Sequence, residues 1–245
     1  MIKRYVKKIY VFDIDGTLTP SRLKMTKEFA KYFDKWSKRN KYYLVTGSDL
    51  DKTKEQLPIA YIDRAEAIFT CCGNQMWRGD ELICNNKFKP PQNLLSYLGE
   101  ELNMSNYHHR AGNHIEDRGS LLNFSVVGRN CSLMERENYF KWDNETGERK
   151  RISKYIREQW DDLDAVIGGQ ISIDIYPKGM DKSQVLNIIE QERLVKPDKY
   201  IFIGDRIEGG GNDYPLAKLM NKTDNCSTFQ TDGWEHTIQI LENLK

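Results

Sequence analysis

The sequence lacks three features that would restrict its function at once: a long apolar run, an excess of one charge and a regular cysteine pattern. Its 37 basic and 36 acidic residues leave a formal net charge of +1, so no overall field attracts nucleic acid or an anionic membrane. The basic start MIKRYVKKIYVF has a short apolar run and no small-residue cleavage site, unlike a signal peptide. We therefore expect a cytoplasmic protein with no membrane span and no nucleic-acid partner.

Cysteine is scarce and irregularly placed. The chain has five cysteines, an odd number, and none of them forms the Cys-x-x-Cys spacing of zinc and redox sites. They are Cys71, Cys72, Cys84, Cys131 and Cys226. We expect reduced thiols with a structural role, because 245 residues can bury a core without disulfide bridges.

Short apolar segments that end abruptly in polar loops recur in the first third of the chain. Residues 9–12 lead into DIDGTLTP, and YYLV leads into TGSD after a helical pattern over residues 26–39. A second helix is expected over residues 51–57, and AIFTCCGN has the pattern of a third strand that ends in a glycine turn. Strands that alternate with helices predict a parallel, doubly wound sheet.

The middle of the chain follows a different pattern. After Pro90-Pro91, LLNFSVVG (121–128) and ISIDIYP (171–177) alternate apolar and polar residues, as half-exposed antiparallel strands do, with a helical stretch over 152–160 between them. The parallel pattern then resumes with DKSQVLNIIEQE, YIFIGD and a short helix over 214–220. We predict an α/β fold with a Rossmann-like parallel-sheet core (1–81 and 181–245). An inserted α+β cap domain, with an antiparallel sheet and helices, would span 82–180.

The loop after the first strand carries two carboxylates, Asp13 and Asp15, two positions apart. One carboxylate could attack phosphorus while the other handles a proton, and Gly16 would let the backbone turn between them. A simple turn or a calcium loop is the alternative. The segment 21–24 does not continue the pattern of EF-hand ligands, which argues against calcium.

Three other loops could complete a phosphate site. Thr46 and Ser48 could bind a phosphoryl oxygen, although Thr-Gly-Ser is also common turn chemistry. Lys182, predicted at the start of a helix, could neutralise charge or could simply be a solvated lysine. Asp205 is a hard oxygen ligand suited to magnesium, and the glycine-rich turn before Asn212 and Asp213 could supply the second shell of the metal.

These four elements together resemble the haloacid-dehalogenase-like phosphotransferases in order and spacing. The segments FDIDGTLTPSR, RGSLLNFSVVGRNCSLMER, GGQISIDIYP, MDK and GDRIEGGGND resemble successive signatures of the eukaryotic-type phosphomannomutases over nearly the whole chain. The resemblance implies that Asp13 is phosphorylated, that Asp15 is the proton donor or acceptor, and that Asp13, Asp15 and Asp205 hold Mg²⁺.

The same resemblance assigns a sugar-phosphate site. Its expected ligands are Arg22, Arg118, Arg129, Arg136, Ser172 and Asp174. Independently, a phosphate dianion distant from the reacting one needs charge-matched donors in a nearly neutral protein. Any single arginine could instead form a surface ion pair worth about 0 to 1 kcal/mol. Ser172 and Asp174 alternate with isoleucines and should share one face of a strand.

The family resemblance implies interconversion of mannose 1-phosphate and mannose 6-phosphate by a homodimer joined through the cap. A hexose 1,6-bisphosphate, of glucose or mannose, would act as activator. The leading alternative is a magnesium-dependent sugar-phosphate phosphatase, and a remote one is a non-catalytic sugar-phosphate-binding protein. The chain departs from the family at Cys71-Cys72-Gly73-Asn74-Gln75 and at Gly119-Ser120. It also lacks the carboxylate after residue 213 that helps the family to bind a second cation.

Overall fold

A computed structural model describes residues 7–244 and divides the chain into two compact units. The core unit comprises Met1–Asn85 and Asp181–Lys245, and the insert unit comprises Asn86–Met180. The predicted basic start lies largely outside the described residues. Within residues 7–244, no helix is both long enough and apolar enough to cross a membrane.

The core unit contains a seven-stranded sheet with the order β11-β10-β1-β2-β3-β4-β5. Its strands are β1 (Lys8–Phe12), β2 (Lys41–Val45), β3 (Ile68–Thr70), β4 (Gln75–Arg78), β5 (Glu81–Asn85), β10 (Lys199–Gly204) and β11 (Cys226–Gln230). The first five strands in this order are parallel, while β4 and β5 extend the edge as antiparallel strands. The sequence pattern predicts that the insert begins at residue 82. The structure instead keeps β5 in the core sheet, because it pairs with β4.

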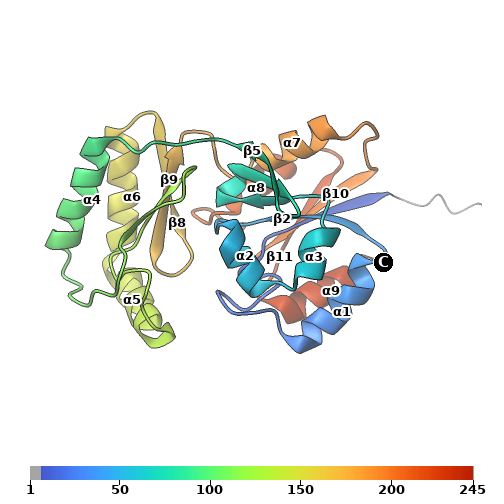
Figure 1. Cartoon of the computed structure of the whole chain (residues 1–245), viewed down its shortest axis with the longest axis horizontal. Helices are drawn as coiled ribbons and strands as arrows, with labels where there is room; N and C mark the ends of the chain where they lie inside the picture. The colour runs from blue at the N-terminus through green and yellow to red at the C-terminus, as the bar shows by residue number, and fades with distance from the viewer. Residues whose placement is uncertain (1–6, 245) are drawn as a thin grey trace, which may run out of the picture. The chain divides into compact units, whose positions relative to one another are not determined.

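Helices cover both faces of this sheet (Figure 1). They are α1 (Lys27–Ser37), α2 (Leu50–Gln56), α3 (Ile59–Arg64), α7 (Gln184–Glu192), α8 (Tyr214–Met220) and α9 (Trp234–Asn243). Alternate residues of β1 separate the two layers: Tyr10 and Phe12 pack with α1 and α9, whereas Ile9 and Val11 pack with α7 and α8. Burial on both faces explains why β1, β2, β3 and β10 are nearly continuous apolar runs.

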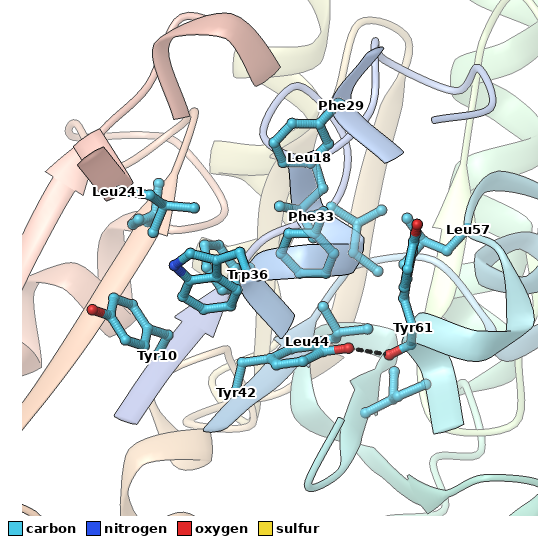
Figure 2. Close-up of a cluster of buried hydrophobic side chains, with 14 of the residues drawn as sticks. Tyr10, Leu18, Phe29, Phe33, Trp36, Tyr42, Leu44, Leu57, Tyr61 and Leu241 are labelled. Carbon is cyan, nitrogen blue, oxygen red and sulfur yellow. Dashed lines mark hydrogen bonds between the residues drawn. The ribbon is translucent and has the colours of Figure 1, made fainter. Parts of the chain in front are cut away.

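Aromatic side chains fill the layer between the sheet and α1 (Figure 2). Phe33 of α1 lies edge-on to Phe12 and Tyr42, with ring centroids 5.9 and 5.3 Å apart. The Tyr42 hydroxyl donates to the backbone carbonyl of Tyr61 at 2.5 Å, so its polar end is satisfied inside the core. This rigid layer fixes β1 and β2, which carry the first two candidate loops.

The insert unit has its own antiparallel sheet and its own core. The sheet order is β6-β7-β9-β8, with β6 (Ile115–Asp117), β7 (Leu122–Phe124), β8 (Leu163–Gly168) and β9 (Ser172–Pro177). Its helices are α4 (Gln92–Met104), α5 (Leu133–Thr146) and α6 (Glu148–Gln159). Apolar residues of all three helices pack with Phe124, Ile173 and Ile175 on one face of the sheet. The predicted α/β fold class, with a parallel core and a separate antiparallel sheet, is confirmed.

Two predicted elements differ from the observed ones. The strand expected over 121–128 is only three residues long. The backbone N–H of Ser125 still donates to the His114 carbonyl in the β6–β7 register, but the N–H of Gly128 donates to the Ser125 carbonyl and the chain bends away. The helix expected over 51–57 ends at Gln56, and a further helix, α3, begins directly after Pro58. Proline is tolerated at a helix start, so this residue separates two helices and does not end the helical region.

Candidate active site

Two carboxylates follow neighbouring parallel strands at one edge of the core sheet. Asp13 comes directly after β1, and Asp205 comes directly after β10. The backbone N–H of Asp13 donates to the Ile203 carbonyl at 3.0 Å, which continues the pairing of the two strands into the loops. The carboxyl ends of parallel strands are the usual position for a ligand in such sheets.

Lys182 lies between two of the acidic groups. Its Nζ donates to Asp13 Oδ1 and to Asp213 Oδ1, both at 2.7 Å, and its side chain is fully buried. The lysine precedes the first residue of α7 by two positions, so the helix begins slightly later than the sequence predicts. Its position between two buried carboxylates excludes the alternative of a solvated surface lysine.

Asp13, Asp205 and Asp213 form a cluster in which one oxygen of each lies within 4.8 Å of the others. Three carboxylates and one ammonium leave excess negative charge in a largely buried site. Burial, followed by the field of Asp213, raises the pKa of Asp13 well above its usual value. The same two causes raise the pKa of Asp205 to about 7. For Lys182, burial opposes the charged form, but Asp13 and Asp213 outweigh it and raise the pKa.

A divalent cation fits this donor set. Magnesium prefers hard carboxylate oxygens, and a positive charge of two would offset the excess of carboxylates over Lys182. From the sequence, Asp213 is expected only to support the metal ligands, but the structure groups it with Asp13 and Asp205. Asp15 does not belong to this group, and its role as a ligand stays a prediction, as does that of Asn212.

Two glycines allow the loops of the cluster to approach one another. Gly16 has φ +80°, and a Cβ atom there would lie 2.5 Å from Asp205 Oδ2. A Cβ atom at Gly204 would lie 2.6 Å from Asp213 Oδ2. Any side chain at these two positions would displace a carboxylate, so glycine is a requirement of the cluster itself.

Asp15 is held by a separate set of contacts. Its Oδ1 accepts from the backbone N–H of Arg22 at 2.6 Å and from Gln56 Nε2 at 2.9 Å. Arg22 adopts φ +62°, an uncommon conformation for a residue with a side chain, and this turn brings its N–H to the carboxylate. Gln56 was not identified from the sequence, because nothing distinguishes a buried glutamine at the end of a polar helix.

Thr46 and Ser48 follow β2 at the same edge of the sheet as Asp13. The Thr46 hydroxyl accepts the backbone N–H of Ser48 at 3.0 Å, and both residues are buried. The carbonyls of Thr46 and Ser48 accept the N–H groups of Cys72 and Cys71, respectively. The loop is therefore well fixed, and its contact with phosphate stays a prediction.

The insert has a polar face opposite its three helices. Ser172 and Asp174 of β9 share this face, as predicted, while Ile173 and Ile175 pack on the other side. Asp174 Oδ1 accepts from Asn123 Nδ2 at 2.5 Å. Both residues are buried on this polar face.

Two of the predicted arginines meet on this polar face. Arg129 Nη1 donates to Ser172 Oγ at 2.7 Å, and Arg118 and Arg129 both contact Glu116. Arg136 lies in the first turn of α5 with its side chain buried, and its convergence with the other two stays a prediction. Glu116 is not identified from the sequence, because β6 is only three residues long and the contact of Glu116 with Arg129 forms only after folding.

Comparisons with known proteins cover both units. Residues 29–244 match the family model of eukaryotic phosphomannomutase. The phosphomannomutase of Galdieria sulphuraria is 34% identical, with 98% of each chain covered. The phosphomannomutase of Saccharomyces cerevisiae is 32% identical, with 99% of this chain and 96% of the relative covered.

Solved structures with lower identity support the fold. The C-terminal domain of trehalose-6-phosphate phosphatase from C. albicans has a TM-score of 0.63 at 15% identity, covering 97% of this chain and 90% of that one. A sugar phosphatase of HAD subclass IIB has a TM-score of 0.54 at 14% identity, with 90% and 93% covered. At these identities the likeness shows a shared fold alone.

Proposed function

The chain belongs to the eukaryotic phosphomannomutase family, and from this membership we propose that it interconverts mannose 1-phosphate and mannose 6-phosphate. The observation that carries the proposal is the buried cluster in which Lys182 bridges Asp13 and Asp213 beside Asp205. Such a cluster suits transfer of a phosphoryl group to a carboxylate, because negative charge accumulates there and must be offset by fixed cations.

Asp13 is the proposed nucleophile. One of its carboxylate oxygens forms a bond to phosphorus, and the bond from phosphorus to the sugar oxygen breaks with its electron pair on that oxygen. Asp13 is already fixed by Lys182 Nζ at 2.7 Å and by the Thr17 hydroxyl at 3.3 Å. Its orientation therefore needs no rearrangement when the phosphate arrives.

Asp15 is the proposed proton donor and acceptor. It gives a proton to the departing sugar oxygen and takes one from the hydroxyl that attacks in the second transfer. The donors from Arg22 and Gln56 both bind Oδ1, so they fix the direction of the carboxylate.

Asp13, Asp205 and Asp213 would hold Mg²⁺, with Asp15 as a further ligand predicted from the sequence and Asn212 as a supporting residue. When bound, the cation would neutralise charge on the phosphate oxygens during transfer.

The family's activator, a hexose 1,6-bisphosphate of glucose or mannose, would transfer a phosphoryl group to Asp13 and be regenerated in each cycle. Thr46, Ser48 and Lys182 would bind the reacting phosphate.

The insert would bind the distal phosphate and the sugar. Arg118, Arg129 and Arg136 are the proposed phosphate ligands, and Ser172 and Asp174 would bind sugar hydroxyls. The contacts between Arg129 and Ser172 support a common site for these two groups. Arg22, from the core unit, is the remaining proposed ligand. We therefore propose that the core unit is catalytic and that the insert unit is a substrate-binding cap.

Two further properties belong to this proposal. We place the enzyme in the cytoplasm, which the free state of all five cysteines supports.

We also expect a homodimer joined through the cap, as the family resemblance implies. Size-exclusion chromatography with light scattering would measure the mass, and a monomer at working concentration would contradict the dimer.

A product assay tests the function. The enzyme receives mannose 1-phosphate, Mg²⁺ and a catalytic amount of glucose 1,6-bisphosphate, and mannose 6-phosphate and inorganic phosphate are followed together. We expect the isomer with little phosphate. Stoichiometric release of phosphate without the isomer would establish the phosphatase alternative, and binding without either product would establish a non-catalytic protein.

A further inference from the structure

The polar face of the insert sheet carries a glutamate with no role in the proposed reaction so far. Glu116 of β6 is in register with Asn123 of β7, which is in register with Asp174 of β9. Side chains in register on antiparallel strands lie on the same face of the sheet. Glu116 therefore lies on the face that carries Asp174, opposite the apolar layer under α4, α5 and α6.

Glu116 joins two arginines through a single oxygen atom. Its Oε2 lies 3.0 Å from Arg118 Nη2 and 3.2 Å from Arg129 Nε. The two arginine side chains are only 8% and 9% exposed, whereas that of Glu116 is 32% exposed. Two nearly buried guanidinium groups are thus held together by one carboxylate that water still reaches.

This arrangement has two opposite effects on phosphate binding. The carboxylate brings two like charges together, which would otherwise repel each other, and so prepares a pair of donors. It also offsets part of their positive charge and accepts a hydrogen bond from Arg118 Nη2, a donor that a phosphate could use. The first effect fixes the geometry of the pair, and the second lowers its affinity for phosphate.

We propose that Glu116 is a positioning residue that keeps Arg118 and Arg129 together and holds their affinity for the distal phosphate at a moderate level. The inference rests on the proposed function, since it assumes that these arginines bind that phosphate. A mutase must release each phosphate of the bisphosphate intermediate so that the sugar can turn between transfers. Very tight binding would stabilise this intermediate and slow the cycle.

Binding measurements without turnover test the affinity. In an Asp13→Asn background, mannose 1-phosphate is titrated calorimetrically into protein with Glu116 and with Glu116→Gln. We expect about tenfold tighter binding in Glu116→Gln, with a steeper dependence on ionic strength, because a nearby negative charge is removed. Glu158→Gln is the matched control: Glu158 pairs with Lys154 across 3.6 Å in an exposed setting and should leave binding unchanged.

Two other variants separate charge from folding. Glu116→Asp keeps the charge and should bind mannose 1-phosphate with nearly the original affinity, whereas Glu116→Ser removes it with a smaller side chain and should again bind more tightly. In protein with Asp13 intact, we expect Glu116→Gln to lower both KM and kcat. A purely structural role would raise KM.

Equal or weaker binding by folded neutral variants would overturn the inference and leave the proposed function intact. If the background protein with Glu116 binds no mannose 1-phosphate at all, the proposed sugar-phosphate site fails, and this inference fails with it. The two failures are therefore distinguishable by the first titration alone.

Discussion

At the scale of single residues, Lys182 shows how a buried charge is accommodated. Its ammonium group has two carboxylate partners at 2.7 Å, and the side chains of Lys182 and Asp213 are both fully buried. Breaking such an arrangement is costly, because the remaining carboxylates face each other without water. The stability of the core and the chemistry of the site therefore depend on the same residue.

Replacement of Lys182 with methionine should lower the free energy of unfolding by about 3 to 5 kcal/mol at pH 7 and lower kcat at least about 100-fold. Urea denaturation and the product assay measure the two effects, and Mg²⁺ should recover part of the lost stability. Lys154→Met is the control, since Lys154 is 70% exposed and should change stability by less than about 1 kcal/mol. Equal stability of the two variants would contradict this account.

The raised pKa of Asp205, about 7, predicts how the metal-free protein responds to pH. Between about pH 4 and about pH 7 the folded protein keeps a proton on Asp205 that the unfolded chain has lost. The free energy of unfolding should therefore fall as pH rises through this range. Urea denaturation in EDTA would measure this fall in the free energy of unfolding. Added Mg²⁺ should make the fall smaller, and Asp205→Asn should remove the part of it that Asp205 causes. If the protein with Asp205 instead gained stability between about pH 4 and about pH 7, relative to the Asp205→Asn variant, the prediction would be wrong.

The sequence indicates which residues converge where a polar group directly follows an apolar strand, while their roles stay predictions. Asp13 and Asp205 stand out in this way, and the structure brings them together. Gln56 and Glu116 could not be assigned, because their contacts depend on chain segments that meet only after folding. The grouping of Asp213 with Asp13 depends on how the glycine-rich turn folds back, which spacing alone does not fix.

At the scale of elements, the loop after β1 depends on a close approach to the loop after β10. Gly16→Ala would introduce a Cβ atom 2.5 Å from Asp205 Oδ2 at φ +80°. We expect Mg²⁺ affinity and kcat to fall at least about tenfold, because a proposed ligand is displaced. Gly79→Ala is the matched control, since Gly79 also has positive φ, +56°, but open space around it.

Magnesium titration of activity would measure the difference between these two variants. If both glycine variants lost activity equally, backbone strain alone would explain the effect, and the close approach to Asp205 would not matter. The comparison thus separates two causes that a single variant would combine.

Element prediction was most accurate for strands buried on both faces and for amphipathic helices. The helix predicted over 214–220 coincides with α8, and YIFIG lies within β10. Short strands such as β6 and the helix α3 escaped prediction, because three to six residues carry too little periodicity. The strand expected over 121–128 is shorter in the structure, because the chain bends where the N–H of Gly128 donates to the Ser125 carbonyl.

At the scale of the whole molecule, each unit has a separate apolar core. The insert core consists of residues from α4, α5, α6 and the four-stranded sheet, without a contribution from the core sheet. Residues 86–180 should therefore fold alone, with a stability on the order of 5 kcal/mol. Cooperative thermal unfolding and dispersed amide resonances would confirm this, whereas gradual unfolding would show that the insert needs the core.

The most direct measurement of the central claim is the site of phosphorylation. The enzyme is mixed with glucose 1,6-bisphosphate and Mg²⁺, quenched in acid, digested and analysed by mass spectrometry. We predict an acyl phosphate on Asp13 that hydroxylamine removes, that EDTA prevents and that Asp13→Asn lacks. Turnover with the phosphoryl group on another residue, or on none, would contradict it.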